Sequence, residues 1–207
     1  MNHPTKISVS ALLLFTLLST YRALGMDLNE AFDRLKTIPE DYSSFGTICE
    51  RVGKLELEEF FPAYEYEILI GVEYRYNSRI LGELDLVVFR RSDGEAIMIT
   101  EVKCSSSFKR ALEKAHGQLQ RFVSAISSGK DIKIYLKKDR SRVFRIDQFD
   151  ENPEILTMSQ KYGTRAGFDL EIGLSLEQAR DLRDRLVRCQ FKKQCPSIAK
   201  YSYKKVP

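Results

Sequence analysis

Three residues near the middle of the chain have types and spacing that suit hydrolytic chemistry. They are Asp85 in Gly82-Glu83-Leu84-Asp85, and Glu101 and Lys103 in Glu101-Val102-Lys103. Two carboxylates and a backbone carbonyl, for which Val102 is the obvious donor, form an all-oxygen site for Mg²⁺ or Mn²⁺. Such an ion lowers the pKa of bound water and neutralises charge on a phosphate. A lysine beside it can orient or deprotonate the attacking water and stabilise a charged transition state.

Two predicted strands carry these residues. Residues 80–89 (ILGELDLVVF) and 95–103 (EAIMITEVK) are rich in β-branched and apolar residues, and Ser92-Asp93-Gly94 between them is a tight-turn signal. Alternation along the first strand predicts that its even-numbered apolar residues share one face, away from Asp85. These apolar residues are Leu84, Leu86 and Val88.

Pairing of the two strands as a hairpin would bring the three side chains together. Residues i and i+2 of a strand point to the same face, so Glu101 and Lys103 project together. Counting outward from the turn places Asp85 opposite residues 100–102. Two carboxylates and an ammonium are therefore expected to converge at one edge of the sheet.

Hydrophobic periodicity predicts an α/β fold around this hairpin. Further strands are expected over 65–76, 132–136 and 168–174, and helices over 27–37, 45–61, 108–127 and about 176–190, the last opened by a capping box from Ser175 to Gln178. Gly53 weakens the second helix, which could form as two pieces. Residues 147–165 are expected to be an irregular loop. The predicted order is α-β-β-β-α-β, followed by a smaller β-α unit.

With these motifs the chain resembles the PD-(D/E)XK nuclease superfamily, in its resolvase-like or RecB-like form. Gly82-Glu83-Leu84-Asp85 looks like the G-E-x-D form of the Asp motif, Glu101-Val102-Lys103 looks like the E-V-K form of the second motif, and the resemblance covers about residues 45–137. It implies a restriction-endonuclease-like core, with a mixed central sheet flanked by helices. No proline precedes Asp85, a departure that bears on the subfamily.

The resemblance also implies roles for individual residues. Asp85 and Glu101 would bind the metal, and Lys103 would be catalytic. Glu50, in the first core helix, would be a further metal ligand. Gln118, on the helix after the E-V-K motif, matches a glutamine that several subfamilies carry there and would belong to the catalytic set. For Glu50, the plain alternative is the polar side of an amphipathic helix.

Charge is distributed unevenly along the chain. Residues 26–102 contain 8 basic and 17 acidic residues, whereas residues 103–145 contain 12 basic and 3 acidic residues. A basic block after a carboxylate-rich one suits phosphate binding beside a metal site. Four basic residues recur on the predicted 108–127 helix and could follow a nucleic-acid backbone: Lys109, Arg110, Lys114 and Arg121. The alternative is a solvated helix face and an edge hairpin.

The first 25 residues have the order of features of a secretory signal peptide. Lys6 precedes an apolar run from Ile7 to Leu18, and Ala23-Leu24-Gly25 places small residues at the −3 and −1 positions of a cleavage site. The alternatives are an uncleaved anchor, a buried helix, or a true start at Met26, which would make the protein cytoplasmic. No later stretch is long enough to span a bilayer, so we expect an exported, soluble mature protein without a membrane partner.

Four cysteines remain after residue 25, and an even count in an exported chain favours two disulfides, with three possible pairings. Cys189 and Cys195 are close enough to clip the C-terminal segment. Cys49 and Cys104 would then tie a helix to the end of a central strand. A structural zinc site is the rival interpretation, but the chain has no C-x-x-C pair, and His116 is the only histidine after residue 25.

Together these observations predict an exported Mg²⁺- or Mn²⁺-dependent nuclease that prefers DNA to RNA. Residues 1–25 would be the signal peptide, 26–146 the nuclease core, and 147–207 a C-terminal β-α extension of the same domain. An inhibitor protein could protect the producing cell. The alternatives are a nucleic-acid-binding module without turnover on the same scaffold, and a disulfide-stabilised interaction protein whose carboxylates are structural.

Overall fold

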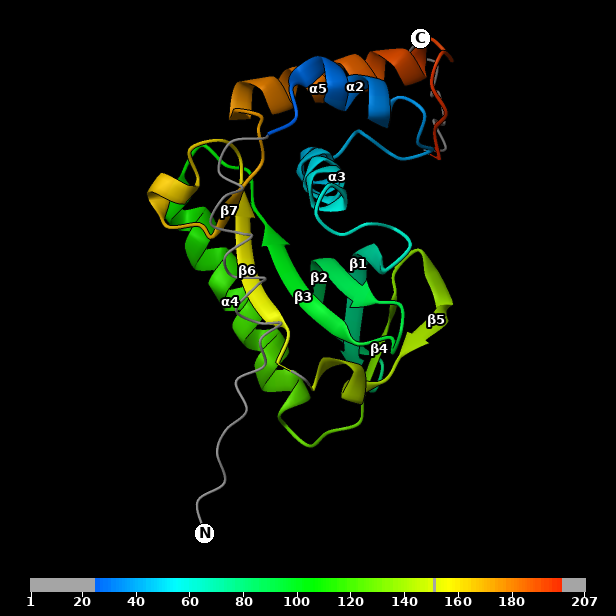
Figure 1. Cartoon of the computed structure of the whole chain (residues 1–207), viewed down its shortest axis with the longest axis vertical. Coiled ribbons are helices and arrows are strands. Elements are labelled where there is room, and N and C mark those ends of the chain that lie inside the picture. The colour runs from blue at the N-terminus through cyan, green and yellow to red at the C-terminus, as the bar shows by residue number, and fades with distance from the viewer. Residues whose placement is uncertain (1–24, 151, 199–207) are drawn as a thin grey trace, which may run out of the picture.

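Seven strands form one mixed sheet in the part of the chain that the computed structural model describes, residues 25–150 and 152–198 (Figure 1). The strand order is β5-β4-β1-β2-β3-β6-β7, antiparallel from β5 to β3 and parallel from β3 to β7. The strands are β1 (Tyr66–Tyr76), β2 (Arg79–Arg90), β3 (Ala96–Val102), β4 (Ile132–Leu136), β5 (Asp139–Phe144), β6 (Glu154–Ser159) and β7 (Leu170–Glu171). The predicted α/β class, with a mixed sheet flanked by helices, is confirmed.

Helices cover both faces of this sheet and create two apolar cores. The α-helices are α2 (Leu28–Leu35), α3 (Phe45–Glu58), α4 (Phe108–Ile126) and α5 (Leu176–Phe191), and the short 3₁₀ turns are η1 (Ile146–Phe149) and η2 (Thr164–Ala166). One core lies between the sheet and α3, with α2 and α5 packed side by side beyond it (Figure 1). The second core lies on the opposite face, under α4 and η1. Ser175 and Gln178 form the predicted capping box at the start of α5.

The β2–β3 hairpin has the predicted register. Leu86 pairs with Thr100 and Val88 pairs with Met98, which leaves Asp85 across from Glu101. Because β3 lies between β2 and β6, both motif strands are interior strands. The three residues therefore meet where β3 ends beside the middle of β2, and no outer strand of the sheet carries them.

Alternation breaks on β2 close to Asp85. Leu86 packs into the core under α3, but Leu84, two residues earlier, packs into the core under α4. On β1, Ile70 likewise packs into the core under α3, whereas Val72 packs into the core under α4. Gly71, between them, has φ +76° and lies across from Asp85. The prediction that Leu84, Leu86 and Val88 share one face is wrong for Leu84, because the left-handed backbone at Gly71 interrupts the pleat.

Helix α3 is one continuous helix, so the predicted break at Gly53 is wrong. A Cβ at this position would lie 2.8 Å from the Met158 sulfur and 3.3 Å from Leu86 Cδ1. The missing side chain lets α3 lie close to β6 and β2. Close packing therefore explains this glycine, and the gain outweighs its low helix propensity.

The predicted loop over 147–165 is also wrong, because it contains β6. This strand pairs in parallel with β3, from Met98 opposite Glu154 to Val102 opposite Met158. A parallel partner so distant in sequence leaves no local turn signal. The basic stretch after β4 folds back as β5, and the predicted 168–174 strand is reduced to two residues.

Both predicted disulfides are present. Cys49 bonds to Cys104 and Cys189 bonds to Cys195, with Cα–Cα distances of 6.4 Å and 5.3 Å. Two disulfides indicate an oxidising, exported compartment. Within the described residues, no helix has the length and apolar character needed to cross a bilayer. The predicted signal peptide lies outside the described residues, apart from Gly25.

Candidate functional site

The ammonium of Lys103 is bound by three oxygens where β3 ends beside the middle of β2. Lys103 Nζ lies 2.9 Å from Asp85 Oδ2 and 3.2 Å from the carbonyl oxygen of Val102, and it also donates to Glu101 Oε1. Asp85 Oδ2 additionally accepts the Val102 backbone N–H at 2.9 Å. These three oxygens belong to the three residues that the sequence predicts as the core metal ligands.

Strand geometry explains why these groups meet. Glu101 and Lys103 lie two residues apart at the end of β3 and therefore point to the same face. The Lys103 N–H donates to the carbonyl of Met158 at 2.9 Å, so pairing with β6 continues one residue past β3 itself. Beyond it, Ser159 Oγ donates to the Lys103 carbonyl at 2.6 Å. The backbone of the catalytic lysine candidate is thereby held by β6.

Glu101 is a buried carboxyl with too few partners. Its exposed fraction is 0%, and its Oε2 is buried without a hydrogen-bond partner. Burial, followed by the negative charge of Asp85, raises the pKa of Glu101 to about 8, although Lys103 opposes this shift. Burial lowers the pKa of Lys103, but the charges of Asp85 and Glu101 outweigh that effect, and the net shift is upward. The lysine therefore remains an ammonium at neutral pH.

Glu50 approaches the same site from α3. Burial, followed by the charges of Asp85 and Glu83, raises the pKa of Glu50 to about 7, while Lys103 and Lys137 oppose the shift. The structure thus brings the sequence-predicted Glu50 within electrostatic reach of Asp85. The disulfide partners Cys49 and Cys104 directly adjoin Glu50 and Lys103 in sequence, so this bond fixes α3 against the end of β3.

The oxygen atoms at this site suit a hard divalent cation. Among residues 25–150 and 152–198, no three His, Cys, Asp or Glu side chains form a metal cage by themselves. The available donors are the carboxylates of Asp85 and Glu101 and the carbonyl of Val102, with Glu50 within electrostatic reach of Asp85. One Glu101 oxygen is buried without a partner, and burial followed by the charge of Asp85 raises the pKa values of Glu50 and Glu101, so a further cation would be favoured here.

The other predicted site residues lie on α4. Gln118 is half-buried at the border of a stripe formed by Ala111, Ala115, Leu119 and Phe122. Lys109, Arg110, Lys114 and Arg121 are all exposed. The helix packs against β2, β3 and β6 and buries that stripe, whereas its basic side chains are exposed. The catalytic role of Gln118 stays a prediction.

Tyr74 links α4 to the cluster, and sequence reasoning missed it. Burial raises the pKa of Tyr74, the positive charge of Arg121 opposes this shift, and the negative charge of Glu101 adds to it. The Tyr74 hydroxyl is therefore within electrostatic reach of both Arg121 and Glu101. A Cβ on Gly82 would approach the Tyr74 hydroxyl to 2.3 Å, which explains the glycine at the start of the Asp motif. This contact depends on the cross-strand pairing of Tyr74 with Gly82, which no local sequence pattern indicates.

Lys137 is a second residue that sequence reasoning did not assign to the site. Its ammonium lies 2.7 Å from Glu83 Oε2, and its charge acts on Glu50. The pKa of Lys137 is raised, mainly by the hydrogen bond to Glu83. The available signal was the basic run that begins where β4 ends, but this run does not indicate which lysine turns toward the site.

Comparison with models of known protein families found no match, and neither did comparison with curated proteins or with solved structures. The chemical interpretation of the site therefore depends on its side-chain geometry and on the motif resemblance.

Proposed function

We propose that this protein is a metal-dependent nuclease that hydrolyses phosphodiester bonds. One observation carries the proposal: a single ammonium is bound by Asp85, Glu101 and the Val102 carbonyl, at a site where one Glu101 oxygen has no partner. Three converging oxygens of this kind can hold a divalent cation, and a lysine in contact with them can act on a phosphate. The element order α3-β1-β2-β3-α4-β4 supports a restriction-endonuclease-like core.

Asp85, Glu101 and the Val102 carbonyl would hold Mg²⁺ or Mn²⁺, with Glu50 beside them. When bound, the ion would acidify a coordinated water and neutralise charge on the scissile phosphate. Lys103 can donate a hydrogen bond to a phosphate oxygen or hold the attacking water at Nζ. Its contact with Asp85 and Glu101 keeps it charged and in place before substrate arrives.

The favoured substrate is DNA, bound along α4 in an exported compartment. The exposed Lys109, Arg110 and Lys114 of α4 provide positive charge for a phosphate backbone. The two disulfides agree with export. An exported nuclease would also require an inhibitor protein wherever it could reach the DNA of the producing cell.

Cleavage of plasmid, linear and single-stranded DNA, with RNA in parallel, tests the proposal directly. We expect cleavage with Mg²⁺ or Mn²⁺ and none with EDTA. Lys103→Ala and Asp85→Ala should each reduce the rate by at least about 10²-fold, as expected for loss of a group that stabilises the transition state. Lys36→Ala, which removes a lysine from the end of α2, is the matched control and should cleave normally.

Thermal unfolding of each variant separates lost chemistry from lost structure. A folded Lys103→Ala protein that cuts DNA at the normal rate would refute the mechanism. Salt-sensitive binding of nucleic acid without metal-dependent cleavage would instead indicate a binding module on this scaffold. The absence of both activities would leave the carboxylates with a structural role.

A further inference from the structure

Glu56 is a partly buried carboxyl outside the candidate active site, and no described lysine or arginine forms an ion pair with it. It lies near the end of α3, between the buried residues Leu55 and Leu57. Its Oε1 accepts two backbone N–H groups, from Met26 at 3.2 Å and from Gly173 at 2.7 Å. The other charged groups that act on it most are two further carboxylates, Glu30 of α2 and Glu171 of β7. A carboxylate in this setting lacks a cation.

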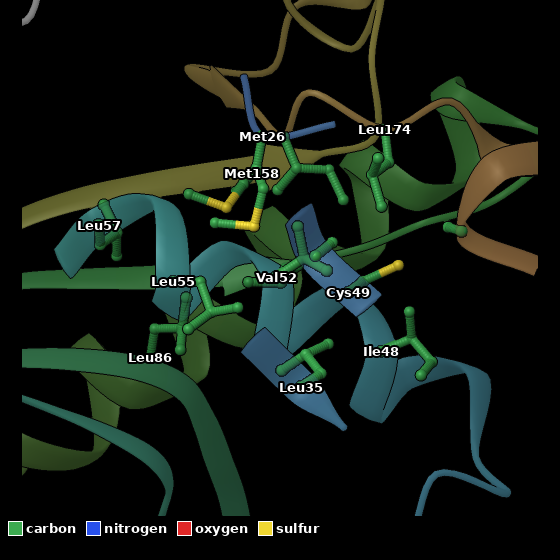
Figure 2. Packing of buried hydrophobic residues seen from close by; sticks show 14 of the residues in the cluster. Met26, Leu35, Ile48, Cys49, Val52, Leu55, Leu57, Leu86, Met158 and Leu174 are labelled. Carbon is green, nitrogen blue, oxygen red and sulfur yellow. The ribbon is translucent and has the colours of Figure 1, made fainter. Parts of the chain in front are cut away.

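The chain segment that reaches Glu56 is the start of the described fold. The side chain of Met26 is 6% exposed and lies in the core with Val52 and Met158 (Figure 2). Immediately after it, the Asp27 carboxylate caps α2 by accepting the N–H groups of Asn29 and Glu30. The position of the Met26 nitrogen is thus fixed from one side by its own buried side chain and from the other side by the helix cap.

Gly25 marks the point where the chain crosses the segment before α5. A Cβ on Gly25 would lie 2.2 Å from the Cα of Gly173, and a Cβ on Gly173 would lie 2.8 Å from the Met26 nitrogen. The Gly25–Met26 bond also follows the small residues of the sequence-predicted cleavage site. Cleavage there leaves its new amino group on Met26, and translation from Met26 would leave the same group.

We propose that the free α-amino group of Met26 binds Glu56, so that formation of this N-terminus locks α2, α3 and the segment before α5 together. Hydrolysis of the Gly25–Met26 peptide bond consumes one water. The hydroxyl goes to the Gly25 carboxyl and the hydrogen goes to the Met26 nitrogen, which takes up a proton from solvent. The resulting ammonium replaces a neutral amide donor at the Glu56 carboxylate, and an ion pair there is stronger than the former hydrogen bond.

The proposal predicts a pH-dependent difference between chains that start before and at Met26. In the longer chain, burial followed by the charges of Glu30 and Glu171 raises the pKa of Glu56 to about 7, against the hydrogen bonds from Gly173 and Met26. A raised pKa of a folded-state carboxyl means that stability falls as the pH rises from about 4.5 through 7. The ammonium removes this loss, so the advantage of the Met26 chain should grow over the same pH range.

Urea unfolding of residues 23–207 and 26–207, produced from cleavable fusions, tests this prediction. At pH 7.5 we expect the folding equilibrium constant of the Met26 chain to be at least about tenfold larger, equivalent to about 1.4 kcal/mol. Glu56→Gln proteins keep a hydrogen-bond acceptor but lose the charge. In this background, the folding equilibrium constants of the two chains should differ by less than about twofold. Glu113→Gln, an exposed glutamate on α4, is the matched control and should preserve the tenfold difference.

A direct measurement covers the case in which Glu56→Gln fails to fold. The pKa of the Met26 α-amino group, followed by NMR in the unmodified 26–207 chain, should lie at least about one unit above its ordinary value of about 8. An ordinary pKa for this group would overturn the proposal. The proposal would also be overturned if the 26–207 chain kept its tenfold stability advantage in the Glu56→Gln background.

Discussion

At the scale of single residues, the candidate site is an excess of carboxylates gathered around one ammonium. Lys103 contacts both Asp85 and Glu101, while Glu50 contributes charge from α3. Burial, followed by like charges, raises the pKa values of both Glu50 and Glu101. Such a site gains from an additional cation, and protons compete with that cation for the same oxygens.

Glu50→Gln tests this competition through its pH dependence. Because the pKa of Glu50 is raised to about 7, the group is largely protonated at pH 6 and ionised at pH 8.5. The variant should therefore require about tenfold more Mg²⁺ for half-maximal cleavage at pH 8.5, the size of effect seen when a neighbour of a metal site is removed. At pH 6 the variant and the unmodified protein should require similar Mg²⁺ concentrations for half-maximal cleavage.

Metal titrations of the cleavage rate at the two pH values provide the measurement. Glu177→Gln, which removes an exposed carboxylate from α5, should follow the unmodified protein at both pH values. A Glu50→Gln protein whose Mg²⁺ requirement is normal at pH 8.5 would remove Glu50 from the metal site.

At the scale of elements, the site is the meeting point of α3, the β2–β3 hairpin and β6. The Cys49–Cys104 disulfide crosslinks α3 to the end of the hairpin, beside Glu50 and Lys103. Strand β6 holds the end of β3 by accepting the Lys103 N–H. Pairing with β6 also makes β3 an interior strand. The geometry of the cluster therefore depends on contacts between segments that are far apart in sequence.

Replacing both cysteines of this crosslink by alanine should lower stability and activity together. The bond closes a long loop, with a sequence separation of 55, and its loss should cost about 2–4 kcal/mol. Cleavage should fall further than the folded fraction does, because α3 carries Glu50 and β3 carries Lys103. Urea unfolding and cleavage rates of the double variant provide the measurements.

The second disulfide supplies the control for this experiment. Cys189 and Cys195 are only 6 positions apart in sequence, at the C-terminal end of α5, so their removal should cost less stability. Cleavage by the fully folded fraction should stay normal in that variant. Equal losses of cleavage in the two double variants would show that the Cys49–Cys104 bond has no specific role in the site.

At the scale of the whole molecule, acidic and basic residues are divided between the strands of the site and the elements that follow them. The carboxylates lie on α3, β2 and β3, and the exposed basic side chains of α4 lie on a helix that packs against β2 and β3. A phosphate backbone bound along α4 would release counterions for each contact that it makes. This arrangement predicts a steep salt dependence of binding.

Removing Arg110 and Lys114 tests this surface. Each phosphate contact that is lost should reduce the slope of log K against log salt by about 1, and affinity should fall to a similar degree for all sequences. Fluorescence anisotropy of labelled DNA in EDTA measures binding without cleavage. Arg188→Ala, on the exposed side of α5, should leave the slope unchanged; an unchanged slope in the α4 variant would exclude this helix as the binding surface.

Several features could be predicted because they depend on local rules. The turn at Ser92-Asp93-Gly94 sets the register of a hairpin, so Asp85 was correctly expected across from Glu101. The spacing of the four cysteines was enough to favour the observed pairing. The capping box at Ser175 likewise involves residues within one helical turn.

Tertiary structure decided everything that depends on distant segments. The location of β6 beside β3, the face change at Gly71, the position of Tyr74 and the approach of Met26 to Glu56 all result from packing between elements. A local pattern specifies the face on which a side chain lies, but the atoms that meet its end belong to other parts of the chain. The sequence alone therefore determined which residues could do chemistry, and long-range packing determined which of their atoms are in contact.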